Sequence, residues 1–179
     1  VRSVELAKAR WEHIDFDQAT WWVPDDSVKT RKGFLVPLTP TVANWFKDLR
    51  DLARFGAYKT GVHKPTFSEP HVKSLEWLVA KLPEAGLAGG IDGIGNVLAR
   101  TPGEGPRLLT GSHLESQNHA GWLDGPLGVI YGLEAARAIR EDKDLAGRGL
   151  GVDVGVWCDE EGHFGHFIGS RSAVGEVSE

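Results

Sequence analysis

The 179-residue chain contains one cysteine and no methionine. A lone Cys158 cannot form an internal disulfide, so we expect a protein of a reducing compartment, the cytoplasm. No stretch approaches the roughly 18–20 apolar residues that a membrane-spanning helix needs, and the first residues do not resemble a secretory signal. The absence of methionine even at position 1 predicts a fragment of a longer protein, or a reading frame opened at an internal start.

The chain also lacks the basic excess of a general nucleic-acid surface, because its net charge is −5. This value averages two unlike parts. Residues 1–54 carry nine Lys/Arg and eight Asp/Glu, whereas residues 55–179 carry eleven and seventeen. The hydrophobic fraction of 41% and the charged fraction of 25% are typical of a globular domain. We therefore expect no strong DNA binding, and we expect the second part to gather carboxylates around cations.

Strand-like and helix-like patterns alternate in the second part of the chain. This alternation predicts a layered α/β domain, in which functional loops follow the carboxyl ends of the strands. The predicted strands are residues 93–100, 107–111 and 151–158, and the predicted helices are residues 74–86 and 127–142.

Two loops of this domain carry candidate metal ligands. His113 follows one predicted strand, and a loop leads from it to Asp124. Asp159, Glu160 and Glu161 follow another strand, where three adjacent acids are costly unless they are solvated or bound to a cation. Imidazole and carboxylate groups are the ligands that zinc accepts. One metal site assembled from both loops would explain the two clusters together.

Six segments of residues 53–179 carry a resemblance to a known family: FGAYKTGVHKPTFS, WLVAKLPEAGL, IDGIGNVLARTPG, TGSHLES, AGWLDGPLGVIYGLEAA and DEEGHFGHFIGSRS. In this order they resemble the zinc-dependent amidohydrolases, which include N-carbamoyl-amino-acid hydrolases, allantoate amidohydrolases and ureidopropionases. The resemblance implies a truncated catalytic half-domain of layered α/β metallohydrolase fold. It also implies hydrolysis of linear carbamoyl or amide C–N bonds in a small N-carbamoyl or ureido substrate.

The resemblance implies two divalent metal ions, zinc or alternatively manganese, cobalt or nickel. His113 and Glu161 would each be a terminal ligand of one ion, and Asp124 would bridge both. Glu160 would take a proton from the attacking water and pass it to the leaving nitrogen. Glu115, where most of the wider family has Asp, would hold the imidazole of His113 in one tautomer.

Other residues receive weaker assignments. Ser170 and Arg171 match the family's Gly-Ser-Arg turn, which either binds substrate or is purely structural. Three histidines are alternatives for metal or substrate contact, and two more are predicted to lie on the surface; these are His119, His163 and His166, and His63 and His71, respectively.

The resemblance also implies parts that this chain lacks. The family completes its metal shell with later histidines and forms homodimers through a separate smaller domain, and both would lie beyond Glu179. We therefore expect weak metal binding and absent or trace catalysis until those histidines are supplied.

Residues 1–52 have a different character. Their patterns predict a small α+β segment, with a helix, a three-stranded hairpin and a second helix. RSVELAKARWEHIDFDQATWWVP and VKTRKGFLVPLTP resemble part of the catalytic domain of phage-type tyrosine recombinases. Arg2 would match an arginine that clamps the scissile phosphate, and Lys29 a lysine that protonates the leaving hydroxyl. No tyrosine or His-x-x-Arg box lies in this segment, so we expect it to be inactive.

Three interpretations of the whole chain follow. The preferred one is a truncated amidohydrolase domain, residues 53–179, preceded by a recombinase-like segment, residues 1–52. The alternatives are a remnant of a site-specific DNA integrase and a non-functional fusion product.

Overall fold

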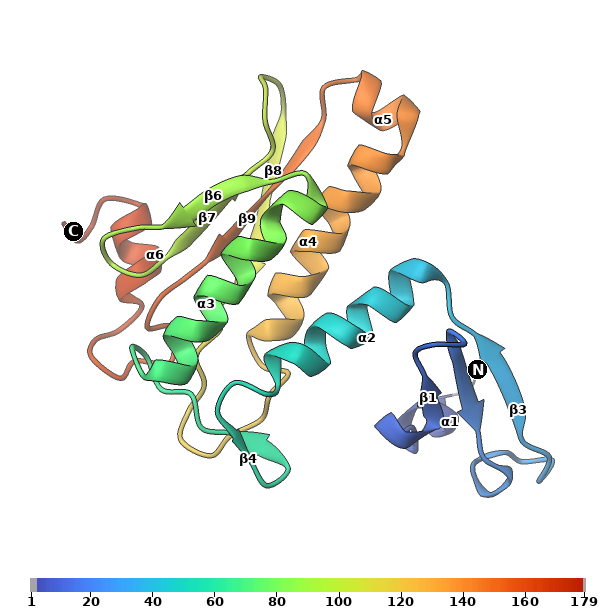
Figure 1. Ribbon diagram of the computed structural model, residues 1–179. Helices are drawn as coiled ribbons and strands as arrows, with labels where there is room; N and C mark the ends of the chain where they lie inside the picture. The colour runs from blue at the N-terminus through green and yellow to red at the C-terminus, as the bar shows by residue number, and fades with distance from the viewer. Residues whose placement is uncertain (1–2, 179) are drawn as a thin grey trace. The chain divides into compact units, whose positions relative to one another are not determined.

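A computed structural model describes residues 3–178 and divides the chain into two compact units, Val1–Lys47 and Asp48–Glu179 (Figure 1). The division falls inside helix α2 (Pro40–Leu52), whereas the boundary expected from sequence lies at the end of that helix. Within residues 3–178, no helix is long and apolar enough to cross a membrane.

The first unit is built around a small antiparallel sheet with the strand order β1-β2-β3. Trp21 and Val23 on the middle strand are buried. The hydroxyl of Thr39 accepts the Val42 amide at 3.3 Å and so caps helix α2. The predicted order of helix, three strands and helix is confirmed, with elements α1 (Ser3–Ala7), η1 (Trp11–His13), β1 (Ile14–Asp15), β2 (Thr20–Val23), η2 (Asp25–Ser27), β3 (Phe34–Pro37) and α2.

The second unit contains a mixed four-stranded sheet with the order β6-β7-β9-β8. Strands β8 and β9 are parallel, and the other neighbouring pairs are antiparallel. Strand β6 was not predicted, because its Ala-Gly-Gly-Ile sequence lacks a strand pattern. The strands of this unit are β4 (Ala57–Tyr58), β5 (Gly61–Val62), β6 (Ala88–Ile91), β7 (Val97–Arg100), β8 (Arg107–Ser112) and β9 (Gly151–Val156).

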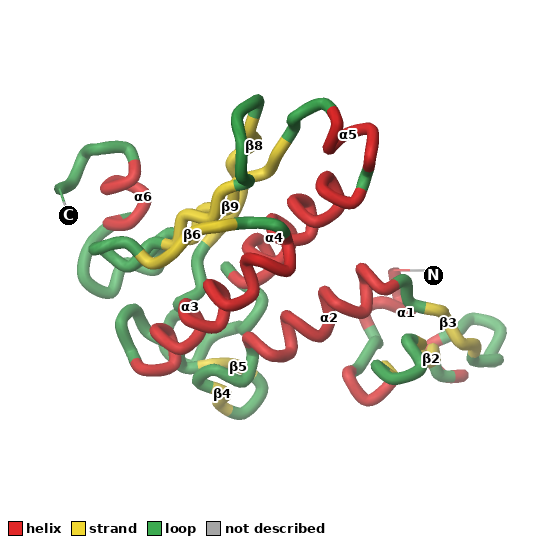
Figure 2. Tube along the Cα trace, turned by 45° about the horizontal axis from the view of Figure 1, so that its top comes forward, coloured by secondary structure: helices red, strands yellow, loops and turns green. Residues whose placement is uncertain are grey.

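Helices α3 and α4 lie on the same side of this sheet, as both views show (Figure 1, Figure 2). Helical spacing predicts that Leu75, Leu78, Val79 and Leu82 share one face; the three leucines are buried and Val79 is half-buried. Gly86 ends the run in the left-handed conformation, with φ +74°. The layered α/β prediction is therefore confirmed. The helices are α3 (Glu69–Lys81), η3 (Leu82–Ala85), α4 (Pro126–Glu141), α5 (Lys143–Gly147) and α6 (Ile168–Ala173).

Strands β8 and β9 approach each other closely at a pair of glycines. Gly111 pairs with Gly155 and has φ +147°. A Cβ atom on Gly111 would lie 1.8 Å from the carbonyl oxygen of Gly155, closer than any real contact. Glycine is therefore required at this point of the sheet, two residues before His113.

We predict that Gly111→Ala lowers the free energy of unfolding by about 2–4 kcal/mol, because the new methyl group overlaps backbone and is strained at this φ. Gly90→Ala on strand β6 is the matched control, since no atom lies within 4 Å of its added Cβ. It should change that free energy by less than about 1 kcal/mol. Urea unfolding followed by tryptophan fluorescence measures both, and equal values for the two variants would contradict the prediction.

Candidate active site

The two loops that carry the predicted site begin at the carboxyl ends of two adjacent strands. Ser112 at the end of β8 pairs in parallel with Val156 at the end of β9, and the Trp157 amide donates to the Ser112 carbonyl at 2.8 Å. His113 directly follows β8, and the Asp159–Glu161 turn closely follows β9. The prediction that both loops follow the carboxyl ends of strands is confirmed, and the structure adds that the two strands are neighbours.

The orientation of the buried His113 ring is fixed by the main chain. Its Nδ1 lies 3.0 Å from the carbonyl oxygen of Glu115. A carbonyl can only accept, so Nδ1 carries the hydrogen, and in the neutral ring Nε2 holds the lone pair. Nε2 lies 3.5 Å from Oε2 of Glu160. A lone pair and a carboxylate oxygen face each other favourably only when a proton or a cation lies between them.

The carboxylate of Glu115 does not have the role predicted for it. Its Oε1 is 4.0 Å from Nδ1 of His113, too far for a hydrogen bond, and accepts the Glu160 amide at 2.6 Å instead. Burial raises the pKa of this carboxyl group, while His113 and nearby backbone amides act in the opposite direction. The prediction was wrong, because the main-chain carbonyl of Glu115 already fixes the imidazole and leaves its carboxylate to bind the opposite loop.

Two residues, Asp159 and Gln117, hold the acidic turn in place. Asp159 has φ +59°, and its buried carboxylate accepts backbone amides of the loop that follows, at His163, Phe164 and Gly165. Gln117 donates from Nε2 to the carbonyl of Glu161 at 2.8 Å and to its carboxylate at 3.1 Å. The role of Asp159 could have been predicted from the sequence, because an aspartate at the start of a loop commonly accepts hydrogen bonds from backbone amides a few residues later. Gln117 gave no comparable signal.

The three predicted metal ligands do not form a ready-made metal site. Among residues 3–178, no group of three or more His, Cys, Asp and Glu side chains is arranged to hold a metal ion. Asp124 is exposed, Glu161 is hydrogen-bonded to Gln117, and His113 faces Glu160. The prediction that His113, Asp124 and Glu161 converge without ions was therefore wrong, although their assignment as ligands stays a prediction.

Gly125 nevertheless brings the Asp124 loop against His113. A Cβ atom on Gly125, whose φ is +83°, would lie 2.7 Å from Cε1 of the His113 ring. The backbone next to Asp124 therefore packs on the imidazole, although the Asp124 side chain is exposed.

Cys158 and Asn96 are buried next to the Asp159–Glu161 turn. Burial, with the negative charges of nearby acids, raises the pKa of the Cys158 thiol to about 12, so this thiol is not a nucleophile. The buried Asn96 side chain accepts the Cys158 amide at 2.9 Å and donates to the Gly169 carbonyl at 3.1 Å. It thereby ties the β6–β7 turn to the acidic turn and to helix α6.

The predicted substrate-binding residues lie in a helix, whereas a turn was expected. Ser170 and Arg171 belong to α6. The Ser170 hydroxyl donates to the Phe167 carbonyl at 3.2 Å, and the exposed Arg171 pairs with Glu176 at 3.1 Å. Their role in substrate binding stays a prediction.

The remaining candidates lie in different surroundings. His163 Nδ1 is 3.0 Å from the Thr66 hydroxyl, and His166 is exposed. The exposed His119 ring stacks on Tyr58 with a centroid separation of 4.1 Å. Arg2 lies outside the described residues. Lys29 is exposed in the segment between β2 and β3, and the recombinase resemblance stays a prediction.

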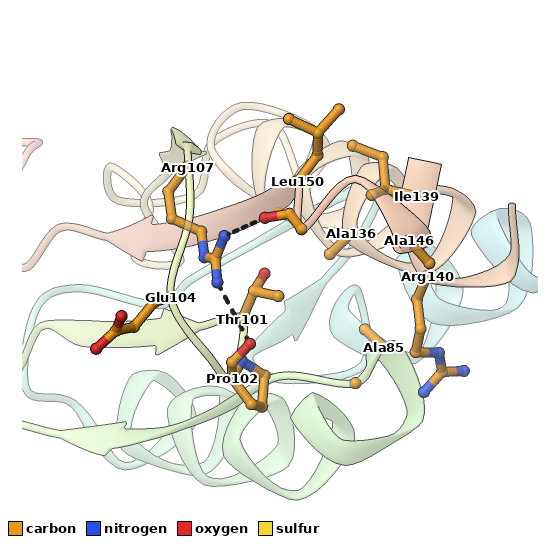
Figure 3. Close-up of a pocket in the computed structure, with 13 residues that line it drawn as sticks. Ala85, Thr101, Pro102, Glu104, Arg107, Ala136, Ile139, Arg140, Ala146 and Leu150 are labelled. Carbon is orange, nitrogen blue, oxygen red and sulfur yellow. Dashed lines mark hydrogen bonds between the residues drawn. The ribbon is translucent and has the colours of Figure 1, made fainter. Parts of the chain in front are cut away.

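A cavity of about 320 Å³ lies at the opposite end of strands β8 and β9 (Figure 3). Arg107, which points into it, donates to the carbonyl oxygens of Gly149 and Gly103, each at 2.8 Å, and to that of Pro102 at 3.3 Å. The Arg140 guanidinium is directed away from Arg107 in Figure 3. Because the main chain already satisfies Arg107, this cavity does not compete with the strand-end loops as the candidate site.

Two further ionisable residues lie next to the strand-end loops. His71, predicted to be a surface residue, is fully buried, and Lys64 is 1% exposed. Burial lowers the pKa of Lys64 to about 8, and Glu115 opposes this shift. Burial, with the charges of Lys64, His113 and His163, lowers the pKa of His71 to about 4. The prediction for His71 was wrong because its helix packs this face inward.

Comparison with known proteins supports the amidohydrolase resemblance. An allantoate deiminase of Arabidopsis thaliana is 29% identical over 132 residues. An N-carbamoyl-L-amino acid amidohydrolase of Geobacillus stearothermophilus is 33% identical over 136 residues. A hydantoinase/carbamoylase family amidase of Burkholderia phymatum is 46% identical, with a TM-score of 0.68. The chain is homologous to these amidohydrolases.

The homology extends over most of this chain and a smaller part of each relative. The matches cover 71%, 72% and 72% of this chain, but 25%, 32% and 31% of the deiminase, the amidohydrolase and the amidase, respectively. This coverage agrees with a half-domain of the amidohydrolase fold. No family model matches the chain.

We predict that His71 makes stability depend on acid. Its pKa is about 4 in the folded chain and 6.5 in the unfolded one, so the unfolded state binds more protons between these values. The contribution of His71 to the free energy of unfolding is therefore complete above about pH 6.5. It falls by about 3 kcal/mol as the pH is lowered to about 4. Urea unfolding of the parent and His71→Gln between pH 4 and 7 isolates this term. Identical pH slopes for the two proteins would contradict the prediction.

Proposed function

We propose that this chain forms part of the catalytic half-domain of an amidohydrolase that cleaves linear C–N bonds in N-carbamoyl or ureido compounds. The observation that carries the proposal is the meeting of His113 with Glu160 at the ends of two parallel strands, 3.5 Å apart, in a chain homologous to carbamoylases. The names of the relatives supply the substrate class, since one is an N-carbamoyl-L-amino acid amidohydrolase and another an allantoate deiminase.

Glu160 is the proton carrier in this proposal. Its side chain is 39% exposed, so it can reach both solvent and a substrate, and its backbone is held by Glu115. A carboxylate in this position takes a proton from the attacking water and passes it to the leaving nitrogen, so the C–N bond breaks as the C–O bond forms. Ser170 and Arg171 are proposed to contact the substrate from helix α6.

The metal ions implied by the resemblance do not fit the described arrangement. His113 Nε2 and Glu160 Oε2 offer two neighbouring donors, but no third His, Cys, Asp or Glu donor joins them within residues 3–178. The proposed proton transfers are therefore assigned to this chain's residues alone. The identity of His113, Asp124 and Glu161 as ligands is tested by titration with zinc or manganese, in which Asp124→Ala should weaken any binding that the parent shows.

A chimera tests the activity. Residues 55–179 of this chain would replace the corresponding part of the Geobacillus stearothermophilus amidohydrolase, and ammonia release from an N-carbamoyl-L-amino acid would be measured. We expect Glu160→Gln in the chimera to lower kcat by roughly 10²- to 10⁴-fold, because the proton carrier is lost.

Glu104→Gln is the matched control, because it makes the same chemical change at an exposed position beside the cavity at the other end of the strands. Its kcat should equal that of the chimera. A folded chimera without activity, or equal losses in the two variants, would contradict the proposed function.

A further inference from the structure

A buried cluster of ionisable side chains lies under the two strand-end loops, and the proposed reaction does not use it. Lys64 comes from the loop after β5, His71 from helix α3 and Glu115 from the loop after β8. Each of the three is at most 1% exposed. Burying a carboxylate this completely is costly unless its oxygens have partners, so the contacts of Glu115 need an explanation.

The tautomer of His71 follows from its backbone contact. The Phe67 amide donates to Nδ1 of His71 at 3.0 Å, so Nδ1 holds a lone pair. The low pKa keeps the ring neutral near pH 7, and the ring hydrogen must then be on Nε2. A protonated ring nitrogen has no lone pair for a metal, so Nε2 can serve here only as a hydrogen-bond donor.

That donor faces one oxygen of Glu115. Nε2 of His71 lies 3.5 Å from Oε2 of Glu115, and neither atom has another hydrogen-bond partner among the described residues. A full N–H···O bond requires them to be only roughly 0.5 Å closer. Two unpartnered buried atoms of complementary type at this separation are each other's natural partners.

The rest of Glu115 connects to the proposed site. Its second oxygen, Oε1, accepts the Glu160 amide at 2.6 Å, and its main-chain carbonyl accepts His113 Nδ1–H at 3.0 Å. A displacement of Glu115 would therefore reach both site residues. The Lys64 ammonium favours the charged carboxylate through the electrostatic attraction between the two groups.

We propose that His71 is a positioning residue, whose Nε2–H holds the Glu115 carboxylate so that Glu115 fixes the backbone of Glu160 and the ring of His113. This role rests on the proposed function only in naming Glu160 and His113 as parts of the reacting site. The linkage itself joins helix α3 to the ends of strands β8 and β9 and requires neither metal nor substrate.

Two substitutions at position 71 separate positioning from packing. The side-chain amide nitrogen of His71→Gln can take the place of Nε2 and restore the bond to Glu115. The side-chain oxygen of His71→Asn can take the place of Nδ1, keeping the Phe67 contact and losing the Glu115 contact. The readout is the hydrogen exchange rate of the Glu160 amide in the full chain, followed by NMR at pH 7.

We expect exchange at Glu160 to be roughly 5- to 30-fold faster in His71→Asn than in the parent, the range that corresponds to losing one hydrogen bond of a buried group. His71→Gln should stay close to the parent. The Val154 amide, in the core of β9, is the control for the fold and should exchange equally slowly in all three proteins.

Parent-like exchange at Glu160 in His71→Asn, or equal acceleration in both variants, would overturn the proposal. If His71→Asn does not fold, the ring-nitrogen chemical shifts of the parent decide, because the proposal requires the hydrogen of His71 on Nε2 and that of His113 on Nδ1. An inactive chimera with a protected Glu160 amide would contradict the proposed function alone. If the chimera is active but the Glu160 amide of the parent chain exchanges freely, the positioning role alone would be contradicted.

Discussion

The parallel pairing of β8 with β9 is the constraint on which the candidate site depends. The two six-residue strands pair along their whole length, and the Trp157 amide continues the pairing by one bond to Ser112. Because both strands run in the same direction, the loops after them start side by side. A shift of one residue in this register would turn His113 to the opposite face of the sheet and separate it from Glu160. A Cβ atom at position 111 would overlap the Gly155 carbonyl oxygen on the neighbouring strand, so Gly111 allows the two strands to approach closely there.

Glu115 provides the second constraint, and its length explains why its role differs from the expected one. Glutamate has one methylene more than aspartate. Its carboxylate extends past the His113 ring and reaches the Glu160 amide, while the main-chain carbonyl takes over the imidazole. The same residue thus orients the histidine through its backbone and the acidic turn through its side chain.

Much of the fold could be predicted from local patterns. The spacing of Leu75, Leu78 and Leu82 predicted their buried face, and the apolar runs at 107–111 and 151–158 predicted the strands that lead to the site. The motif order also predicted the homology that comparison with known proteins found. Strand β6 was missed because Gly89 and Gly90 give no strand signal, and its pairing with β7 supplies the missing information.

The sequence by itself determined the strands and helices that lead to the site, their order and the residue types that meet at the ends of β8 and β9, because hydrophobic periodicity and turn residues act over a few positions. Only the tertiary structure decided that His71 and Lys64 are buried, that Gln117 holds Glu161, and that His113 faces Glu160 while Asp124 remains exposed. The physical reason is that each of these states depends on partners from distant segments. From the sequence alone, His71 is indistinguishable from a surface histidine; its burial is decided when helix α3 packs against the loop that holds Glu115.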